Sequence, residues 1–237
     1  MTMIYLALDF PNWKEAQSFL ETNQLKGVPV KVGMELFYKE GPTVIEALKK
    51  DEHPIFLDLK LHDIPTTVKK AMRNVASLGV EMVNVHAFGG SDMIQAAKEG
   101  LIKGAAGSIE PKLLAVTLLT SMDETVIRDE LKVESSLEST VIHLASLAKN
   151  NGADGVVCSA HEANEIKQAC GKQFLTVTPG IRLSDSAHND QKRIATPQLA
   201  GNQGADRIVI GRSVTQAPNP YKAYQKAIEE WNHVIQQ

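Results

Sequence analysis

Phe56–Thr67, with the sequence FLDLKLHDIPTT, combines the pattern of a buried β-strand with three charged side chains. Side chains alternate between the two faces of a strand, so Phe56, Asp58 and Lys60 share one face and the intervening leucines share the other. Burying charge is costly unless the charge is paired. The charged run ends at a proline turn, where a strand meets its loop. We therefore predict a functional site at this strand end rather than an ordinary buried ion pair.

The composition fits one globular domain spanning residues 1–237. Of these residues, 43% are hydrophobic and 22% are charged, and the formal net charge is −3. A chain of this length is typical of an α/β barrel that does not split into domains. The charge balance predicts no nucleic-acid partner. We expect no membrane segment, because no apolar run approaches the required length, and the N-terminal residues resemble a strand rather than a signal peptide.

The two cysteines, Cys158 and Cys170, predict neither a disulfide nor a metal site. Neither lies at metal-ligand spacing from a histidine. We expect free thiols, a cytoplasmic protein and no bound metal.

Short β-rich segments recur through the chain and alternate with helical patterns, as in repeated βα units. The predicted strands are Met3–Asp9, Val28–Gly33, Pro54–Lys60, Met82–His86, Lys112–Leu119, Gly155–Ser159, Phe174–Thr178 and Arg207–Gly211. The predicted helices lie near 12–23, 42–50, 66–78, 90–102, 137–150, 161–169, 196–202 and 220–235.

Eight strands with eight helices and no linker predict an α/β fold, a single (β/α)8 TIM barrel. The alternative is a doubly wound open sheet, which would carry a glycine-rich nucleotide fingerprint after an early strand. No such motif is present in the sequence.

Polar residues collect at the predicted carboxyl ends of the strands, which is where barrels build their active sites. They come from seven different strands, so we expect them to converge on one pocket. They include Asp9, Lys31, Asp58, Lys60, His86, Thr120, Ser121, Arg182 and Arg212.

The charges around Lys60 favour one kind of chemistry. We expect Lys31, Asp58, Lys60 and Asp63 to form an alternating array of cations and anions. A lysine that forms a Schiff base must be neutral, whereas neighbouring carboxylates favour the ammonium form. A charged Lys60 suits the stabilisation and protonation of a carbanion. This interpretation argues against an aldolase that works through a Schiff base.

A phosphate subsite is predicted after the last strand, where Gly211 precedes Arg212. Barrels commonly bind phosphate at this position, and the guanidinium fork matches phosphate oxygens. The polar segment Arg182–Arg193 is interpreted either as a lid over the ligand or as a solvated loop.

The run Asp58-x-Lys60-x-x-Asp63-Ile64-Pro65 resembles the signature of the orotidine 5′-phosphate decarboxylase family. The resemblance extends over nearly the whole chain, and the length is similar to that of the short bacterial members. The supporting segments occur in the family's order: Leu8-Asp9, Lys31–Gly33, Thr178–Arg182 and Val209–Arg212.

The resemblance implies a role for each matching residue. Lys60 resembles the proton donor to carbon 6 of the pyrimidine, and Asp58 the carboxylate beside the departing carboxylate. Asp9 and Lys31 resemble the groups that hold the ribose. Thr120, or its neighbour Ser121, matches a hydroxyl near the ring. The pyrimidine and phosphate side is implied for Pro179, Arg182, Gln191, Gly211 and Arg212.

The resemblance also implies the reaction and the assembly. The reaction would be the decarboxylation of orotidine 5′-monophosphate to uridine 5′-monophosphate in de novo pyrimidine biosynthesis, without a cofactor. The protein would be a homodimer to which Asp63, Ile64 and Thr67 contribute across the interface.

Two other functions remain open from the sequence. Magnesium-dependent decarboxylases and aldolases of sugar phosphates share a D-x-K-x-x-D run, but they need additional carboxylates at the ends of the first two strands. The second strand of this chain carries Lys31 instead, and Glu35 lies two residues beyond Gly33. A barrel that binds a phosphate ligand without catalysis is the second alternative, and the intact charged motif argues against it.

Overall fold

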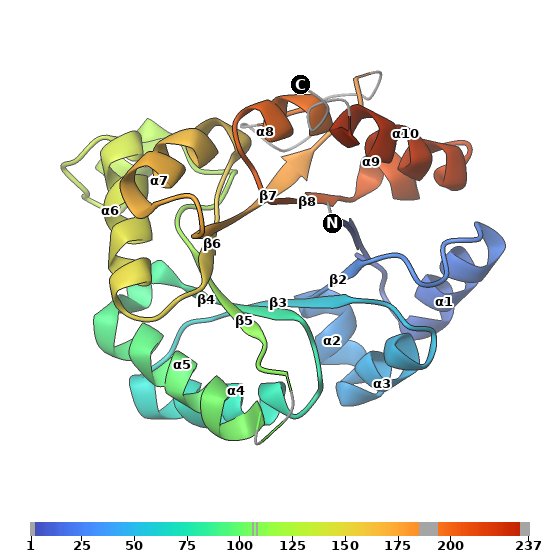
Figure 1. Ribbon diagram of the computed structural model, residues 1–237, viewed down its shortest axis with the longest axis horizontal. Coiled ribbons are helices and arrows are strands. Elements are labelled where there is room, and N and C mark those ends of the chain that lie inside the picture. Colours follow the sequence, from blue (N-terminus) through green and yellow to red (C-terminus); the bar gives the residue numbers. More distant parts are fainter. Residues whose placement is uncertain (1–2, 106, 108, 185–193, 233–237) are drawn as a thin grey trace.

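Eight parallel strands close into a barrel in the computed structural model of the protein (Figure 1). The structure describes residues 3–105, 107, 109–184 and 194–232. Each strand pairs with the next, and the pairing of Met3 with Arg207 joins β8 to β1. The strands are β1 Met3–Ala7, β2 Val30–Gly33, β3 Ile55–Leu61, β4 Met82–His86, β5 Lys112–Val116, β6 Gly155–Val157, β7 Leu175–Ile181 and β8 Arg207–Ile210. The predicted TIM barrel is confirmed.

Helices surround the barrel on its outside (Figure 1). Their bounds are α1 Trp13–Thr22, α2 Met34–Glu40, α3 Pro42–Lys50, α4 Pro65–Ala76, α5 Gly90–Ala105, α6 Leu137–Asn150, α7 Ala163–Cys170, α8 Pro197–Asn202, α9 Arg212–Thr215 and α10 Pro220–Asn232. The sequence did not predict α2, α9 or the π-helical turn Val126–Glu130. Among the described residues, no helix combines the length and the apolar character needed to cross a membrane.

Several strands end earlier than predicted. β1, β5, β6 and β8 stop before their polar carboxyl-terminal neighbours, so Asp9, Thr120, Ser159 and Gly211 lie beyond the regular hydrogen-bonded ladder. β7 continues beyond its predicted end to Ile181 because a register shift accommodates Pro179 and Gly180. Asp9, Thr120, Ser159 and Gly211 therefore lie on connections at the rim of the barrel, whereas Lys31, Asp58 and Lys60 lie within β2 and β3.

Two separate apolar clusters fill the two sides of the barrel wall. The inner cluster consists of Tyr5, Ala7, Phe56, Met82, Leu114, Val116, Val157, Val177 and Val209. The outer cluster includes Ile55, Leu57 and Leu59 of β3 and packs against the helices. The predicted alternation in β3 is therefore confirmed, with Phe56 inside the barrel and the leucines outside.

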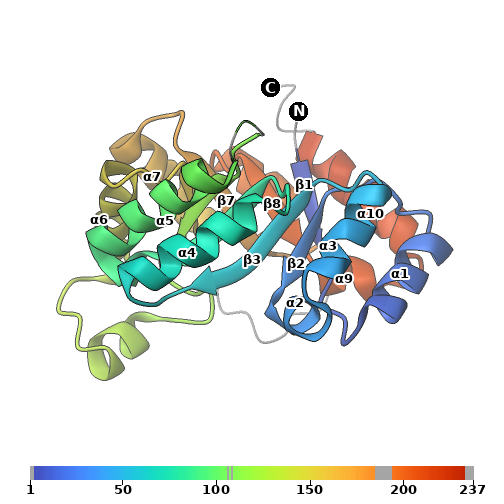
Figure 2. The ribbon, with the colours of Figure 1, turned by 90° about the horizontal axis from the view of Figure 1, so that it is seen from below.

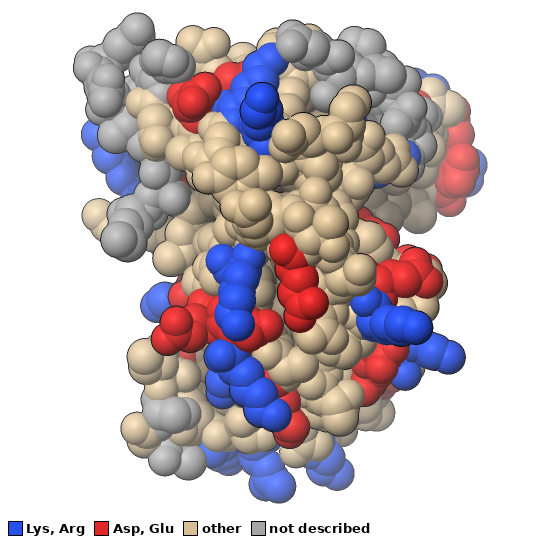
Figure 3. All heavy atoms as spheres, turned by 90° about the vertical axis from the view of Figure 1, so that its right-hand side faces the viewer, with Lys and Arg blue, Asp and Glu red and all other residues tan. Residues whose placement is uncertain are grey.

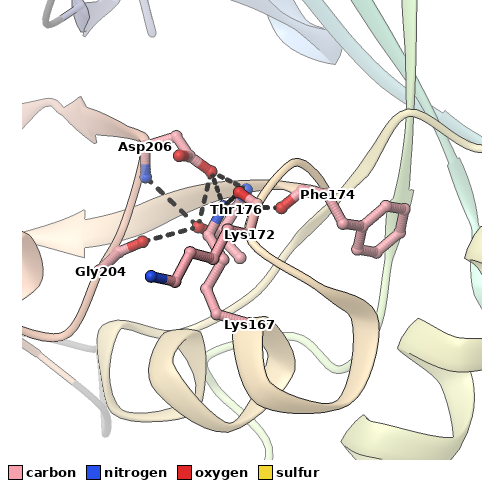
Figure 4. Close-up of polar contacts among 6 residues, drawn as sticks. All are labelled: Lys167, Lys172, Phe174, Thr176, Gly204 and Asp206. Atoms are coloured by element: carbon pink, nitrogen blue, oxygen red, sulfur yellow. Dashed lines mark hydrogen bonds and ion pairs between the residues drawn. The ribbon is translucent and has the colours of Figure 1, made fainter.

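Polar contacts join elements at the amino-terminal ends of the strands. Arg207 donates a hydrogen bond to the Tyr5 hydroxyl at 2.8 Å, and this hydroxyl donates to Glu81 at 2.7 Å. Figure 4 shows a second cluster, in which Lys167 of α7 pairs with Asp206 at 2.5 Å. Asp206 also accepts hydrogen bonds from the backbone and side chain of Thr176. The candidate site lies at the opposite end of the barrel from these contacts.

The connection between β5 and α6 extends from the end of the barrel at which the strands finish, and it is yellow-green in Figure 2. The face shown in Figure 3 carries Lys and Arg side chains interspersed with Asp and Glu, without a concentrated basic patch. This distribution agrees with the low net charge of −3.

Candidate active site

The end of β3 departs from regular strand geometry. Leu57 pairs with Val83 and Leu61 pairs with Val85, so three residues of β3 stand opposite the single residue Asn84 of β4. Lys60 lies within this bulge and has a φ angle of 52°. Such a left-handed conformation costs a lysine of the order of 1–3 kcal/mol. Bulges of this kind redirect side chains and often occur beside active sites.

Four charged side chains from three neighbouring strands form an alternating array. Lys31 Nζ lies 3.0 Å from Asp9 Oδ1 and 3.4 Å from Asp58 Oδ2. Lys60 Nζ lies 2.8 Å from Asp58 Oδ1. The order along the array is Asp9, Lys31, Asp58, Lys60, so each of the two central charges has an opposite charge on both sides.

The pairing within the array keeps its buried groups ionised. Burial raises the pKa of the Asp58 carboxyl, but the charges of Lys31 and Lys60 and the hydrogen bonds from Lys60 and Asn84 outweigh this effect, so the pKa lies below its ordinary value. Burial lowers the pKa of the Lys31 ammonium, but Asp58 and Asp9 reverse this effect and raise the pKa above its ordinary value. Both groups therefore carry their charges at neutral pH.

The array lies on one wall of a cavity of about 290 Å³. The floor belongs to the apolar inner cluster and includes Phe56, Val116 and Val209. Polar groups lie above it, so a ligand here would meet an apolar base and charged walls. Of the predicted site residues, those lining the cavity are Asp9, Lys31, Asp58, Lys60, Thr120, Pro179, Arg182, Gly211 and Arg212.

The side of the cavity formed by β7 and β8 carries two cations, Arg182 and Arg212. Arg182 is buried, and its Nη1 donates a hydrogen bond to the Ile181 carbonyl at 3.0 Å, which orients the guanidinium. Arg212 follows Gly211 directly after β8. Two guanidinium groups on one wall suit an anionic group of a ligand. The lysines of the array lie on other strands, β2 and β3.

Both hydroxyl residues considered for the ring contact, Thr120 and Ser121, line the cavity. Gln191 lies outside the described residues, as does most of the predicted lid Arg182–Arg193.

The expected position of Asp63 beside Lys60 is not found within the chain. The Asp63 side chain is exposed and accepts a hydrogen bond from the backbone of Ile64 at 2.6 Å. Ile64 is 65% exposed, and Thr67 is also exposed on the first turn of α4. The chain turns outward here to begin α4, which takes these three residues away from the cavity. Asp9 rather than Asp63 supplies the second acid of the array.

The main site-associated residue to which the sequence alone assigned no role is Asn84. It is fully buried, and its Nδ2 donates a hydrogen bond to Asp58 Oδ1 at 2.7 Å. Its Oδ1 accepts a hydrogen bond from the backbone N–H of Lys60, also at 2.7 Å. An amide in the middle of an apolar strand is a sequence signal, because a buried amide requires hydrogen-bonding partners.

Comparisons with known proteins agree with this geometry. Residues 2–227 match the model of the orotidine 5′-phosphate decarboxylase / HUMPS family. The chain is 55% identical to an orotidine 5′-phosphate decarboxylase from Bacillus pumilus, over 95% of this chain and 97% of the relative. It is 53% identical to one from Bacillus cytotoxicus, over 98% of each chain.

Solved structures show the same similarity. The crystal structure of orotidine 5′-phosphate decarboxylase from Lactobacillus acidophilus matches with a TM-score of 0.87 and 44% identity, over 98% of this chain and 99% of that one. An uncharacterized conserved protein from Geobacillus kaustophilus matches with a TM-score of 0.86 and 47% identity, over 97% of this chain and 100% of that one. The barrel, the charged array and these full-length similarities together establish that the chain belongs to the orotidine 5′-phosphate decarboxylase / HUMPS family.

Proposed function

We propose that this chain converts orotidine 5′-phosphate into uridine 5′-monophosphate and carbon dioxide in pyrimidine biosynthesis, using its own side chains and no cofactor. The observation that carries the proposal is the Lys60 ammonium. It lies 2.8 Å from the Asp58 carboxylate on the wall of a cavity that also presents Arg182 and Arg212. The relatives named above carry the name of this activity.

The proposed step breaks the bond between carbon 6 of the pyrimidine and the carbon of its carboxylate. The electron pair stays on carbon 6 in the plane of the ring, where the π system cannot delocalise it. The Lys60 ammonium stabilises this pair and then transfers a proton to carbon 6, which leaves a neutral amine that regains a proton from solvent. A preorganised donor of this kind contributes about 3–4 kcal/mol to transition-state stabilisation.

Asp58 has two roles in this mechanism. It orients the Lys60 side chain through the ion pair, and its own charge is maintained by Lys31 on its other side. Its repulsion of the substrate carboxylate is a secondary contribution through ground-state destabilisation.

The remaining cavity residues bind the parts of the substrate that do not react. Arg182, Gly211 and Arg212 are assigned to the phosphate side, with Pro179 near the pyrimidine and Asp9 and Lys31 at the ribose. The hydroxyl contact is assigned to Thr120 or Ser121, and Gln191 is assigned to the pyrimidine and phosphate side from the family resemblance. Binding energy from these remote contacts can hold the reacting carbon against Lys60 and so increase turnover.

A magnesium-dependent reaction on a sugar phosphate fits the array less well. Lys31 Nζ occupies the position between Asp9 and Asp58, at 3.0 and 3.4 Å, and its positive charge would repel a metal ion. Within the described part of the chain, no three His, Cys, Asp or Glu side chains are grouped in a way that could hold a metal ion.

We also propose a homodimer in which Asp63, Ile64 and Thr67 of one protomer approach the active site of the other. Ile64 and Phe88 are large apolar side chains, 65% and 42% exposed, on the connections that follow β3 and β4. Met34, 45% exposed, follows β2 at the same rim. Exposed apolar groups that are close together favour a protein partner. Asp63 would then complete the surroundings of Lys60 from the partner.

We also propose that residues 1–237 form one catalytic domain that works in the cytoplasm. Cys158 and Cys170 are both buried and form no disulfide, which fits a reducing compartment.

The test is a spectrophotometric assay of orotidine 5′-phosphate with and without EDTA. We expect loss of substrate absorbance at the same rate in both. Turnover that stops in EDTA and returns with Mg²⁺ would favour the metal-dependent alternative. Affinity for uridine 5′-monophosphate without any turnover would identify a binding protein and contradict the proposal.

A further inference from the structure

Asn84 joins the two residues proposed to carry the chemistry, although it does not line the cavity itself. It is fully buried in β4, on the strand that faces the bulge of β3. Its amide orientation follows from its partners, since a backbone N–H can only donate and an ionised carboxylate can only accept. The Oδ1 atom must therefore face Lys60 N and the Nδ2 atom must face Asp58, as observed.

Each of the two hydrogen bonds restrains a different degree of freedom. Asn84 Nδ2 donates to Asp58 Oδ1, the same oxygen that lies 2.8 Å from Lys60 Nζ. Asn84 Oδ1 accepts from the backbone of Lys60 at its φ angle of 52°, a conformation that lysine rarely adopts. One amide thus orients the acid and holds the backbone from which the ammonium extends.

We propose that Asn84 is a positioning residue that sets the geometry of the Asp58–Lys60 pair for protonation of the substrate. This inference rests on the proposed decarboxylase function for its kinetic consequences. Its structural content, that Asn84 maintains the bulged backbone of Lys60, does not depend on the substrate.

Titratable groups from several strands lie around Asp58, and of these the two lysines favour its ionisation alongside Asn84. Lys31 approaches from β2 with Asp9 behind it, Lys60 approaches from β3, and His86 lies nearby on β4. The hydrogen bond from Asn84 is one of the contributions that lower the pKa of Asp58. Removing this donor is expected to raise that pKa and to move the acidic limb of the kcat profile to higher pH.

The experiment compares two substitutions. Asn84→Ala removes both hydrogen bonds, whereas Asn84→Asp keeps an acceptor for Lys60 N and replaces the donor to Asp58 with a second carboxylate. We expect Asn84→Ala to lower kcat by about 10- to 100-fold, the range typical of residues that orient a reacting group. The affinity for uridine 5′-monophosphate should stay within about threefold, because Asn84 does not line the cavity. Asn84→Asp should show the larger upward shift of the acidic limb.

Thr176→Val is the matched control. Thr176 is also fully buried in a strand and hydrogen-bonds through its side chain, but to Asp206 and Gly204 in the cluster of Figure 4, remote from the cavity. The Thr176→Val variant should be less stable than the parent, while its kcat and pH profile stay unchanged. A general effect of losing buried hydrogen bonds would make the control behave like the Asn84 variants.

A kcat within threefold of the parent for folded Asn84→Ala, or an unmoved acidic limb for Asn84→Asp, would overturn the proposal. If Asn84→Ala does not fold, the position of the acidic limb in Asn84→Asp tests the proposal instead. If the parent does not decarboxylate orotidine 5′-phosphate, the proposed function fails, and crystal structures of the parent and variants decide the positioning role. In the structure of Asn84→Ala, the backbone of Lys60 should leave its left-handed conformation. If Lys60 keeps this conformation and its contact with Asp58, the inference would be contradicted.

Discussion

Lys60 combines an unfavourable backbone conformation with two compensating contacts. The left-handed φ of 52° costs of the order of 1–3 kcal/mol. The ion pair with Asp58 and the hydrogen bond from Lys60 N to Asn84 oppose this cost, and a hydrogen bond that involves a charged group contributes about 1.5–3 kcal/mol. The strained conformation is therefore sustained by the residues that the mechanism uses.

The charge of Asp58 leads to a pH prediction. Below its pKa, Asp58 would be protonated and Lys60 would lose its anionic partner, so kcat should fall on the acid side. Because the pKa lies below the ordinary value of 3.8, this fall should occur below about pH 4. The measurement is kcat at saturating substrate in short assays across the acid range. An acidic limb near pH 6 that disappears in Asp58→Asn would contradict this assignment.

At the residue scale, the sequence identified the charged groups and missed their exact neighbours. Asp58 and Lys60 were evident because charges stand out in an apolar strand, and both line the cavity. Asp63 was expected beside Lys60 from its spacing, but the turn into α4 carries it outward, and sequence spacing does not report that direction. Asn84 was assigned no role because its partners are 26 and 24 residues away along the chain.

At the scale of elements, alternation of apolar and polar residues predicted the strands better than their ends. The bounds of β4, α3 and α6 agree with the sequence expectation. Helix α2 was missed because it follows β2 directly at Met34 and has only seven residues, and α9 has only four residues. The bulge in β3 was also missed, since pairing with β4 creates it rather than any local pattern.

The packing of α5 on α4 supplies a prediction about stability. A Cβ atom at Gly104 would lie 2.2 Å from the carbonyl oxygen of Arg73 and 2.8 Å from the Cβ of Ala76, both in α4. Alanine normally favours a helix interior over glycine by about 1 kcal/mol, but overpacking costs about 1–3 kcal/mol. We expect Gly104→Ala to lower the free energy of unfolding, in urea titrations, by at least ~1 kcal/mol.

The control for this prediction is Lys103→Ala, at the adjacent exposed position of α5. It should change the free energy of unfolding by less than about 0.5 kcal/mol. A stabilised Gly104→Ala variant would show that the two helices separate easily and that the close contact is not required.

At the scale of the whole molecule, the barrel places its stabilising polar contacts and its charged array at opposite ends of the strands. The apolar inner cluster fills the barrel interior, and the hydrogen bonds of Tyr5, Glu81 and Arg207 join strands near their amino-terminal ends. The charged array and the cavity lie at the other ends of the same strands. Closure of the barrel was predictable from the eight repeated units, whereas their periodicity carries no information on whether two chains assemble.

The proposed dimer predicts complementation between two inactive variants. Lys60→Ala removes the proton donor, and Asp63→Ala removes the group expected from the partner. In a mixed dimer, one site would lack both residues and the other would have both. Unfolding and refolding an equal mixture should therefore restore about one quarter of the parental activity. A mixture of Thr67→Ala with Thr67→Ser serves as the control for the exchange procedure. If the mixture of Lys60→Ala with Asp63→Ala stays inactive after refolding, this result would contradict a shared site.

The central claim is that the charged Lys60, held by Asp58, stabilises and protonates the carbanion. The most direct measurement is kcat for orotidine 5′-phosphate with Lys60→Ala, together with its affinity for uridine 5′-monophosphate. We expect kcat to fall by at least about 10³-fold, because one group supplies both electrostatic stabilisation and the proton, while the affinity for the nucleotide remains measurable. Near-normal turnover by a folded Lys60→Ala protein would contradict the mechanism.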